Sequence, residues 1–152
     1  MTYMSKMYPV MLNLVDKKVL VVGGGQIAKR KVEFLQETGA EITIISPDID
    51  PTLSRLNVKW LETIYKQGLA REYFLVFACT NDQAVNQLVV NDCDDRQLIN
   101  DTSNQKNSNF FNMAIVSNDE CLIGISTYGK NPSRSKLIKK ELTNWLKNFK
   151  FK

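Results

Sequence analysis

Short apolar runs alternate with segments of helical periodicity along the first two thirds of the chain. The apolar runs, bounded by turn residues, cover residues 18–23, 40–46, 58–63, 73–80 and 96–101. Residues 25–39 and 81–95 lie between them, and in the first segment the positions at helical spacing are Ile27, Lys31, Phe34 and Leu35. Buried strands that alternate with helices predict an α/β fold with a parallel sheet and crossover helices.

The pattern changes after residue 110. Residues 110–129 contain two β-rich runs on either side of a polar turn, which predicts a β-hairpin. Residues 131–149 predict one amphipathic helix, whose apolar stripe consists of Leu137, Ile138, Leu142, Trp145, Leu146 and Phe149. We therefore expect two parts, 1–110 with the parallel sheet and 111–152 with the hairpin and helix.

Composition limits the chemistry available to the chain. The sequence has 152 residues, of which 43% are apolar and 24% are charged, as in an ordinary globular domain. It contains no histidine, which removes the commonest metal ligand and the commonest general base. Its three cysteines (Cys79, Cys93 and Cys121) form no Cys-x-x-Cys pair and predict reduced thiols in the cytoplasm.

The formal net charge is +4, and the basic residues concentrate in the last quarter of the sequence. A basic region of this kind suits a polyanionic ligand, although a solvated helix face has the same composition. No apolar run approaches the roughly 18 residues of a membrane helix. No nucleic-acid motif or aromatic platform accompanies the charge, so we expect neither a membrane nor a nucleic acid as a partner.

A glycine-rich turn joins the first predicted strand to the first predicted helix. Its sequence, Gly23-x-Gly25-x-x-Ala28, is the dinucleotide-binding fingerprint in its expected context. The first glycine permits a tight turn, the second lets backbone approach a pyrophosphate, and the small third residue lets the helix pack closely on the strand. The alternative is a glycine turn with a structural role only. The context favours dinucleotide binding and a Rossmann-like doubly wound sheet.

The end of the second predicted strand bears on which dinucleotide is bound. The acidic residue that normally holds the ribose is missing from its usual place, and the strand ends Ser46-Pro47-Asp48. Ser46 can hydrogen-bond a ribose hydroxyl, and no Arg or Lys precedes Arg55 to meet a ribose phosphate, so NAD is favoured over NADP. Thr80 and Asn81 follow the fourth strand, where open α/β sheets bind ligands, although both are also helix-cap residues.

Three stretches of the sequence resemble the precorrin-2 dehydrogenases and the N-terminal module of sirohaem synthase. They are YPVMLNLVDKKVLVVGGGQIAKRKVEFLQETGAEITIISPDI, FACTNDQAVNQLV and ISTYGKNPSRSKLIKKEL. The resemblance implies NAD-dependent oxidation of precorrin-2 to sirohydrochlorin in sirohaem biosynthesis, with iron insertion by some members. Precorrin-2 carries eight carboxylates, which would give the basic C-terminal quarter a purpose.

The resemblance also implies roles for individual residues. The cofactor would contact Gly23, Gly24, Gly25, Gln26, Ile27, Ser46, Pro47, Asp48, Thr80 and Asn81. The hairpin and the following helix would form a homodimer, with Thr127, Lys130 and Arg134 binding substrate in the cleft.

The chain departs from the family at three points. It is shorter after the last helix, so its dimerisation region is expected to be truncated, and Tyr128-Gly129 replaces a double glycine. Ser103 occupies the position of the family's aspartate, while Asp101 lies two residues earlier. In an extended strand the two would share a face about 6.6 Å apart, so Asp101 and Ser103 are the catalytic candidates. The alternative is a polar strand end that only caps the sheet.

Three further functions remain open from the sequence. The chain could be a non-catalytic NAD-binding regulatory module, a degenerate family member without turnover, or a bifunctional dehydrogenase and ferrochelatase. With no histidine, no paired cysteines and a serine at position 103, we expect no metal site and no useful iron insertion.

Overall fold

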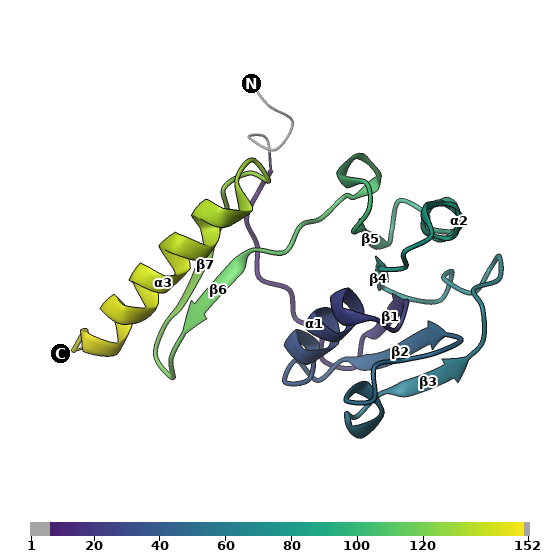
Figure 1. The fold of residues 1–152 in the computed structure, drawn as a ribbon, viewed down its shortest axis with the longest axis horizontal. Coiled ribbons are helices and arrows are strands. Elements are labelled where there is room, and N and C mark those ends of the chain that lie inside the picture. Colours follow the sequence, from purple (N-terminus) through teal and green to yellow (C-terminus); the bar gives the residue numbers. More distant parts are fainter. Residues whose placement is uncertain (1–6, 151–152) are drawn as a thin grey trace. The chain divides into compact units, whose positions relative to one another are not determined.

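The computed structural model describes residues 7–150, and these form two compact units (Figure 1). Residues 12–111 make up the first unit, and residues 112–150 together with 7–11 make up the second. The division falls beside the expected one at residue 110, and the roles expected of the two parts stay predictions. No helix among residues 7–150 has the length and apolar character needed to cross a membrane.

A five-stranded parallel sheet forms the centre of the first unit. Its strands are β1 (Lys18–Val22), β2 (Glu41–Ser46), β3 (Lys59–Glu62), β4 (Leu75–Ala78) and β5 (Leu98–Asp101). The spatial order is β3-β2-β1-β4-β5, with Val22 of β1 level with Ile45 of β2 and Ala78 of β4. The order reverses between β1 and β4, and ligands of open α/β sheets bind at this kind of switch point. The predicted α/β, Rossmann-like fold class is confirmed.

Each face of the sheet contributes to a separate apolar core. One face presents Val19, Val21, Ile42, Ile44, Leu75 and Phe77 to helix α1 (Gln26–Leu35). The opposite face presents Leu20, Val22, Ile45, Val76 and Ala78, which cluster with Val89 of helix α2 (Gln83–Asp92). Alternate residues of one strand therefore serve opposite cores, which is why the central strands read as uninterrupted apolar runs. Burial of each such side chain contributes about 1.5–3 kcal/mol.

Helix α1 packs on the sheet through a different face from the one that its periodicity indicated. Ala28, Val32 and Leu35 are buried, whereas Ile27 and Phe34 are 42% and 58% exposed. Of the four positions at helical spacing, Leu35 is buried and Lys31 is partly buried with its Nζ atom over the Phe77 ring, whereas Ile27 and Phe34 face outward. The short side chain of Ala28 lets the first turn of α1 approach the sheet closely, and this approach fixes which face turns inward.

The second unit contains the predicted hairpin and C-terminal helix. Strands β6 (Ala114–Ser117) and β7 (Leu122–Ile125) pair antiparallel, and helix α3 (Pro132–Asn148) packs on them. Asn131 caps the helix, because its side chain accepts a hydrogen bond from the Arg134 amide. Of the predicted apolar stripe, only Leu146 is fully buried, in a small cluster with Val116 and Ile125. Ile138 and Leu142 are partly buried at its edge.

Two short 3₁₀ segments complete the first unit, η2 (Leu53–Arg55) after β2 and η3 (Gln105–Asn107) after β5.

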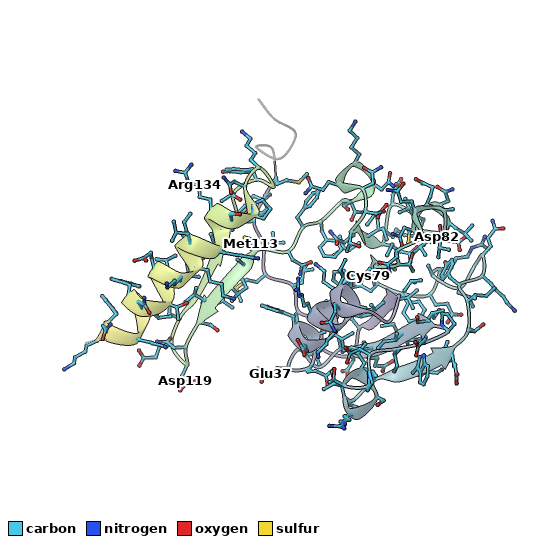
Figure 2. All side chains as sticks on the ribbon, in the orientation of Figure 1. Glu37, Cys79, Asp82, Met113, Asp119 and Arg134 are labelled. Atoms are coloured by element: carbon cyan, nitrogen blue, oxygen red, sulfur yellow. The ribbon has the colours of Figure 1, made fainter. Side chains whose placement is uncertain are left out.

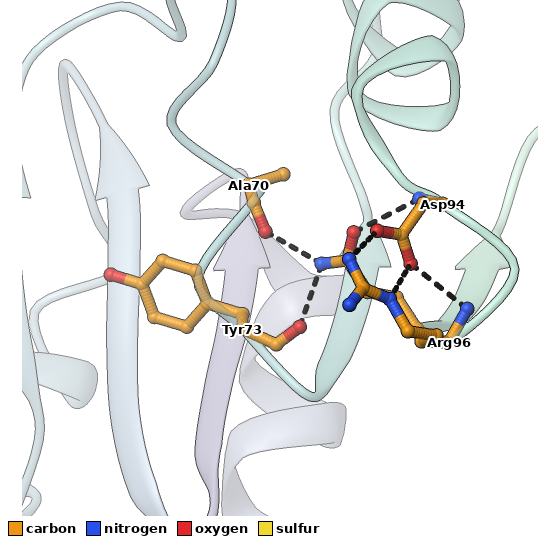
Figure 3. Close-up of polar contacts among 5 residues, drawn as sticks. Ala70, Tyr73, Asp94 and Arg96 are labelled. Atoms are coloured by element: carbon orange, nitrogen blue, oxygen red, sulfur yellow. Dashed lines mark hydrogen bonds and ion pairs between the residues drawn. The ribbon is translucent and has the colours of Figure 1, made fainter.

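A buried glutamine joins the β3–β4 connection to the start of β5. The Nε2 atom of Gln97 donates to the carbonyls of Ala70 and Tyr73 at 2.7 and 2.6 Å (Figure 3). Its Oε1 atom accepts from the Asp94 amide at 3.0 Å. Asp94 also holds Arg96 through an exposed ion pair, and such pairs contribute little to stability. Gln97 thus links the β3–β4 connection to the turn between α2 and β5 through side-chain hydrogen bonds.

We predict that Gln97→Leu lowers the free energy of unfolding by about 2–4 kcal/mol, because it leaves two carbonyls and one amide without their partner. Denaturant titration of the purified protein measures the change. Gln83→Leu makes the same substitution at an exposed position of α2 and should stay within about 0.5 kcal/mol of the wild type. Equal stabilities of the two variants would contradict this role of Gln97.

Candidate functional site

The β1–α1 turn brings the backbone of β1 against the ends of the two neighbouring strands. Gly23 has a φ of +117°, and a β-carbon there would lie 2.7 Å from the Cys79 carbonyl oxygen that follows β4. A β-carbon on Gly24 would overlap the Asp48 carbonyl oxygen that follows β2. The Gly24 carbonyl also accepts from the Asp50 amide at 2.7 Å. Both positions therefore require glycine for reasons of space, independently of any ligand.

Gly25 has the opposite environment. It is the N-cap of α1, and a β-carbon there would meet nothing within 4 Å. Because glycine offers no side-chain oxygen, no side chain caps the first-turn amides of this helix. A helix N-terminus with free amides and open space before it is suited to a phosphate group. The residues present thus fit the diphosphate of a dinucleotide.

A cavity of about 780 Å³ opens beside this turn. The ten residues predicted to bind cofactor all line it: Gly23, Gly24, Gly25, Gln26, Ile27, Ser46, Pro47, Asp48, Thr80 and Asn81. They come from the β1–α1 turn, the end of β2 and the segment after β4. In Figure 2 the segment after β4 can be found by the labels on Cys79 and Asp82, which also line the cavity. The switch point of the sheet therefore gathers one set of residues from three separate parts of the sequence.

The charged residues of the cavity lining are all acidic. They are Asp48, Asp50 and Asp82, and the lining contains no lysine or arginine. Asp50 accepts hydrogen bonds from the Thr52 hydroxyl at 2.6 Å, the Thr52 amide at 2.9 Å and Gln26 Nε2 at 2.7 Å. The hydrogen bonds from Thr52 hold the pKa of Asp50 below its usual range, with further help from Lys29 and Gln26. This carboxylate therefore stays ionised at neutral pH and orients the Gln26 amide.

The segment after β4 is held by side chains of α2. Asp82 caps the helix by accepting from the Ala84 and Val85 amides at 2.8 and 3.3 Å. Thr80 contacts Asn86, whose Oδ1 atom accepts from the Thr80 amide at 3.1 Å and from its hydroxyl at 2.7 Å. The helix cap is therefore Asp82 and neither Thr80 nor Asn81, and Asn81 is exposed at the cavity.

The catalytic candidates Asp101 and Ser103 lie outside the cavity lining. Asp101 ends β5 and is 3% exposed, and its Oδ1 accepts from the Ser103 hydroxyl at 2.6 Å and the Ser103 amide at 2.8 Å. Asn107 Nδ2 donates to the other carboxylate oxygen at 2.8 Å. The expected 6.6 Å spacing along an extended strand was wrong, because the chain turns after Asp101 and brings Ser103 back onto it.

This environment favours the ionised form of Asp101. Burial by itself would raise its pKa, but the hydrogen bonds from Ser103, Asn107 and the backbone outweigh burial and lower the pKa below its usual range. The Ser103 hydroxyl donates its only hydrogen to this carboxylate. Burial raises the pKa of the Cys79 thiol to about 12, so Cys79 stays protonated.

The predicted substrate residues belong to the second unit. Thr127 Oγ1 donates to the Asn131 carbonyl at 3.1 Å and lies 2.8 Å from Ser135 Oγ, so it anchors the loop before α3. Lys130 and Arg134 are exposed, and Figure 2 places Arg134 near the start of α3. Tyr128 has a φ of +55°, the left-handed conformation that the usual glycine would adopt more easily.

The sequence analysis missed three polar residues at this site. Asp50 had a signal, since Asp-x-Thr after a strand is a common side-chain turn. Tyr65 lines the cavity from the β3–β4 connection, and nothing in its local sequence indicated this. Asn86 is fully buried, and its position on the inward face of α2 could have been read from the helical period. No group of three or more Cys, Asp or Glu side chains suited to a metal ion occurs among residues 7–150.

Comparison with known proteins identifies the family. A family model described as "Putative NAD(P)-binding" matches residues 10–114. The precorrin-2 dehydrogenase of Bacillus subtilis (strain 168) is 32% identical over 86% of this chain and 83% of that protein. The precorrin-2 dehydrogenase of Priestia megaterium is 36% identical over 91% of this chain and 70% of that protein.

A solved structure described as SirC, precorrin-2 dehydrogenase, has a TM-score of 0.83 and 32% identity, covering 95% of this chain and 72% of that one. The chain spans about a third of the length of the curated siroheme synthases that it also matches. Both the sequence and the fold therefore agree over most of the precorrin-2 dehydrogenase chain. This protein belongs to the NAD(P)-binding family that includes the precorrin-2 dehydrogenases and siroheme synthases.

Proposed function

We propose that this protein binds NAD and oxidises precorrin-2 to sirohydrochlorin. The observation that carries the proposal is the glycine turn at the switch point, in a chain that matches precorrin-2 dehydrogenases over most of their length. In the balanced reaction, precorrin-2 and NAD⁺ give sirohydrochlorin, NADH and one proton. When bound, the nicotinamide ring supplies the acceptor for the hydride.

The backbone of the β1–α1 turn is the proposed diphosphate site. Amides at the start of α1 would donate to the phosphate oxygens, while Ser46 and Asp48 lie where the adenosine ribose is expected. Thr80 and Asn81 would contact the rest of the cofactor from the segment after β4. The three aspartates and the lack of a basic residue in the lining support NAD over NADP, because the extra phosphate of NADP would find no positive side chain in the lining and would be repelled by the carboxylates.

Asp101 and Ser103 are proposed to assist the oxidation as a hydrogen-bonded pair. Asp101 is a weak proton acceptor, since its hydrogen bonds stabilise the ionised carboxylate. Its proposed role is therefore to stabilise positive charge that develops as hydride leaves the tetrapyrrole, with water taking the released proton. Ser103 would orient the carboxylate through the 2.6 Å bond.

The loop before α3 is the proposed contact for the substrate carboxylates. Lys130 and Arg134 are exposed cations near the start of α3, and Thr127 holds the loop in shape. A substrate with eight carboxylates needs several such cations, which the basic last quarter of the chain can provide. The cytoplasm is the proposed location, which the free thiols of Cys79, Cys93 and Cys121 support.

A homodimer formed through the second unit is also proposed. The unit exposes the apolar side chains of Leu122, Leu137, Trp145 and Phe149, and its buried cluster is small. Exposed apolar groups of this number on so small a unit favour burial against a second copy.

An NAD-binding module without turnover is the second candidate. The observation that favours it is Ser103 at the position of the family's aspartate, together with the low proton affinity of Asp101. Such a protein would bind NAD and leave precorrin-2 unchanged.

We predict that the purified protein converts precorrin-2 to sirohydrochlorin with NAD, at a kcat/KM at least tenfold higher than with NADP. Anaerobic assays follow sirohydrochlorin and NADH absorbance together, and the two products should appear in equal amounts. Calorimetric binding of NAD without product would support the binding module instead. Equal rates with both dinucleotides would contradict the role given to the acidic lining.

We predict that Gly25→Asp weakens NAD binding at least tenfold while leaving the free energy of unfolding unchanged or slightly higher. Aspartate is a good N-cap, but its carboxylate would occupy the diphosphate site and repel the phosphates. Gly25→Asn is the matched control, because it fills the same space and caps equally well without a charge. In calorimetric titration the NAD affinity of Gly25→Asn should lie between those of the wild type and Gly25→Asp. Identical NAD affinities for Gly25→Asp and the wild type would contradict diphosphate binding at this turn.

We predict a species of twice the 17.4 kDa chain mass in sedimentation at micromolar concentration. Leu137→Glu should shift it to the monomer, because Leu137 is 60% exposed and the change places a charge on the proposed contact face. Lys136→Glu, an exposed neighbour on α3, changes charge without removing apolar surface and serves as the control. A wild-type protein that sediments only as monomer would contradict the dimer.

A further inference from the structure

Asn86 has no role in the function described so far, yet its side chain is one of the most completely bonded groups in the first unit. It is 0% exposed, on the face of α2 that packs toward the sheet. Its Oδ1 atom accepts from the Thr80 amide and from the Thr80 hydroxyl, whose one hydrogen also has the Asp82 carbonyl within reach. Its Nδ2 atom donates to the Thr80 carbonyl and to Ser103 Oγ, each at 3.1 Å, so both donor hydrogens of the carboxamide are used.

The bond to Ser103 continues to Asp101. Ser103 Oγ accepts from Asn86 and donates its hydrogen to Asp101 Oδ1 at 2.6 Å. Every bond in this chain has a fixed direction, because Asn86 Nδ2 can only donate and the ionised Asp101 can only accept. Asn86 therefore determines where the Ser103 hydroxyl points, and the hydroxyl determines the position of the carboxylate oxygen.

The other carboxylate oxygen of Asp101 is also connected to helix α2, through Asn107 and Gln87. Asn107 Nδ2 donates one hydrogen to Asp101 Oδ2 at 2.8 Å and the other to Gln87 Oε1 at 3.1 Å. Asn86 and Gln87 thus fix the two oxygens of one carboxylate through one intermediate side chain each. The Asn86 side also reaches the cavity, since its partner Thr80 lines the cavity.

We infer that Asn86 is a positioning residue for the reaction, which links the cofactor-contacting segment at Thr80 to the Asp101 carboxylate through Ser103. This inference rests on the proposed function. The link passes through four residues of three separate segments, and each step is a hydrogen bond of 2.6–3.1 Å. A buried asparagine that only satisfied the backbone of its own turn would not need the bond to Ser103.

The test separates the two ends of the link. Ser103→Ala removes the connection to Asp101 and leaves every Thr80 contact in place, so it should lower kcat at least tenfold with NAD affinity within twofold of the wild type. Ser103→Thr retains the hydroxyl and should restore most of kcat. Asn86→Asp keeps the acceptor for Thr80 but loses both donated bonds, so it should lower kcat and also weaken NAD binding by about tenfold.

A matched control makes the same substitution outside this network. Asn57→Asp changes an exposed position before β3 and should leave kcat and NAD affinity unchanged. A readout without turnover is the carboxyl carbon resonance of Asp101 in an acid titration. Its midpoint should rise in Ser103→Ala and in Asn86→Asp and stay in place in Asn57→Asp, because the first two lose bonds that favour the ionised form.

The outcomes distinguish this inference from the proposed function. If the wild-type protein makes no sirohydrochlorin, the proposed function is wrong. If the titration midpoint of Asp101 is then also unchanged in Ser103→Ala, the link is wrong as well. Active protein in which Ser103→Ala keeps the wild-type kcat overturns the link alone. If Asn86→Asp does not fold, the Ser103→Ala and Ser103→Thr pair at an exposed position decides the matter. Equal losses in Ser103→Ala and Ser103→Thr would also count against it.

Discussion

The close approach of three strand ends at Gly23 and Gly24 is the constraint on which the site depends. The end of β1 lies against the Cys79 carbonyl on one side and the Asp48 carbonyl on the other, with room for hydrogen atoms only. Because β2 and β4 flank β1 in the sheet, a side chain at either glycine would push these strands apart. The same packing directs the chain outward at Gly25, where α1 begins and the cavity opens. The anion site at the helix start is thus a consequence of how the sheet closes around the turn.

Polar bonds and apolar packing together hold the wall of the cavity that Tyr65 lines, since Tyr65 and Ala70 also belong to the apolar core that contains Val89 of α2. Tyr65 lines the cavity, and its hydroxyl donates to Asp92 Oδ2 at 2.6 Å while accepting from the Ala70 amide at 3.1 Å. The Gly68 amide donates to the same Asp92 oxygen at 2.6 Å. Burial and the neighbouring Asp92 carboxylate raise the pKa of Tyr65, so this hydroxyl stays protonated and donates at neutral pH. These hydrogen bonds attach the connection from β3 to β4 to Asp92 of α2. The part of the cavity wall formed by Tyr65 is therefore held in place by that helix.

Hydrophobic patterning predicted the elements well because burial on both faces of the sheet leaves a continuous apolar run. It placed the ends less well, since local hydrogen bonds decide them. The run at 96–101 contains Gln97, yet β5 begins at Leu98, because the Gln97 amide donates to the Asp94 carbonyl in the preceding turn. The helix was expected to extend to Gly39 but ends at Leu35, where the Thr38 hydroxyl donates to the Leu35 carbonyl at 2.7 Å. Gly39 lies beyond the helix and has a left-handed conformation.

The site residues divide in the same way. Positions in the glycine turn and at the ends of β2 and β4 follow from strand order alone, so a motif and a count of strands were enough to find them. Asp50 and Asn86 each had a local signal, but their hydrogen-bond partners depend on where side chains point after the chain has folded, and sequence spacing does not give those partners. Asn86 reaches Ser103 across 17 residues, a distance along the chain that no helical or strand period connects.

The chain's lack of histidine explains why a carboxylate, Asp101, is the charged group in this arrangement. With no imidazole in the sequence, a carboxylate is the available ionisable group beside the segment after β4, and its charge must be held in place by neutral donors. Neutral donors fix the position of a charge without cancelling it, whereas a lysine or arginine would have paired with Asp101 and reduced its field. The serine at position 103 serves that purpose, and an aspartate there would have placed two negative charges within hydrogen-bonding distance of each other. The pair therefore has one carboxylate and one donor, and the carboxylate, on the 3% exposed Asp101, lies at its buried end.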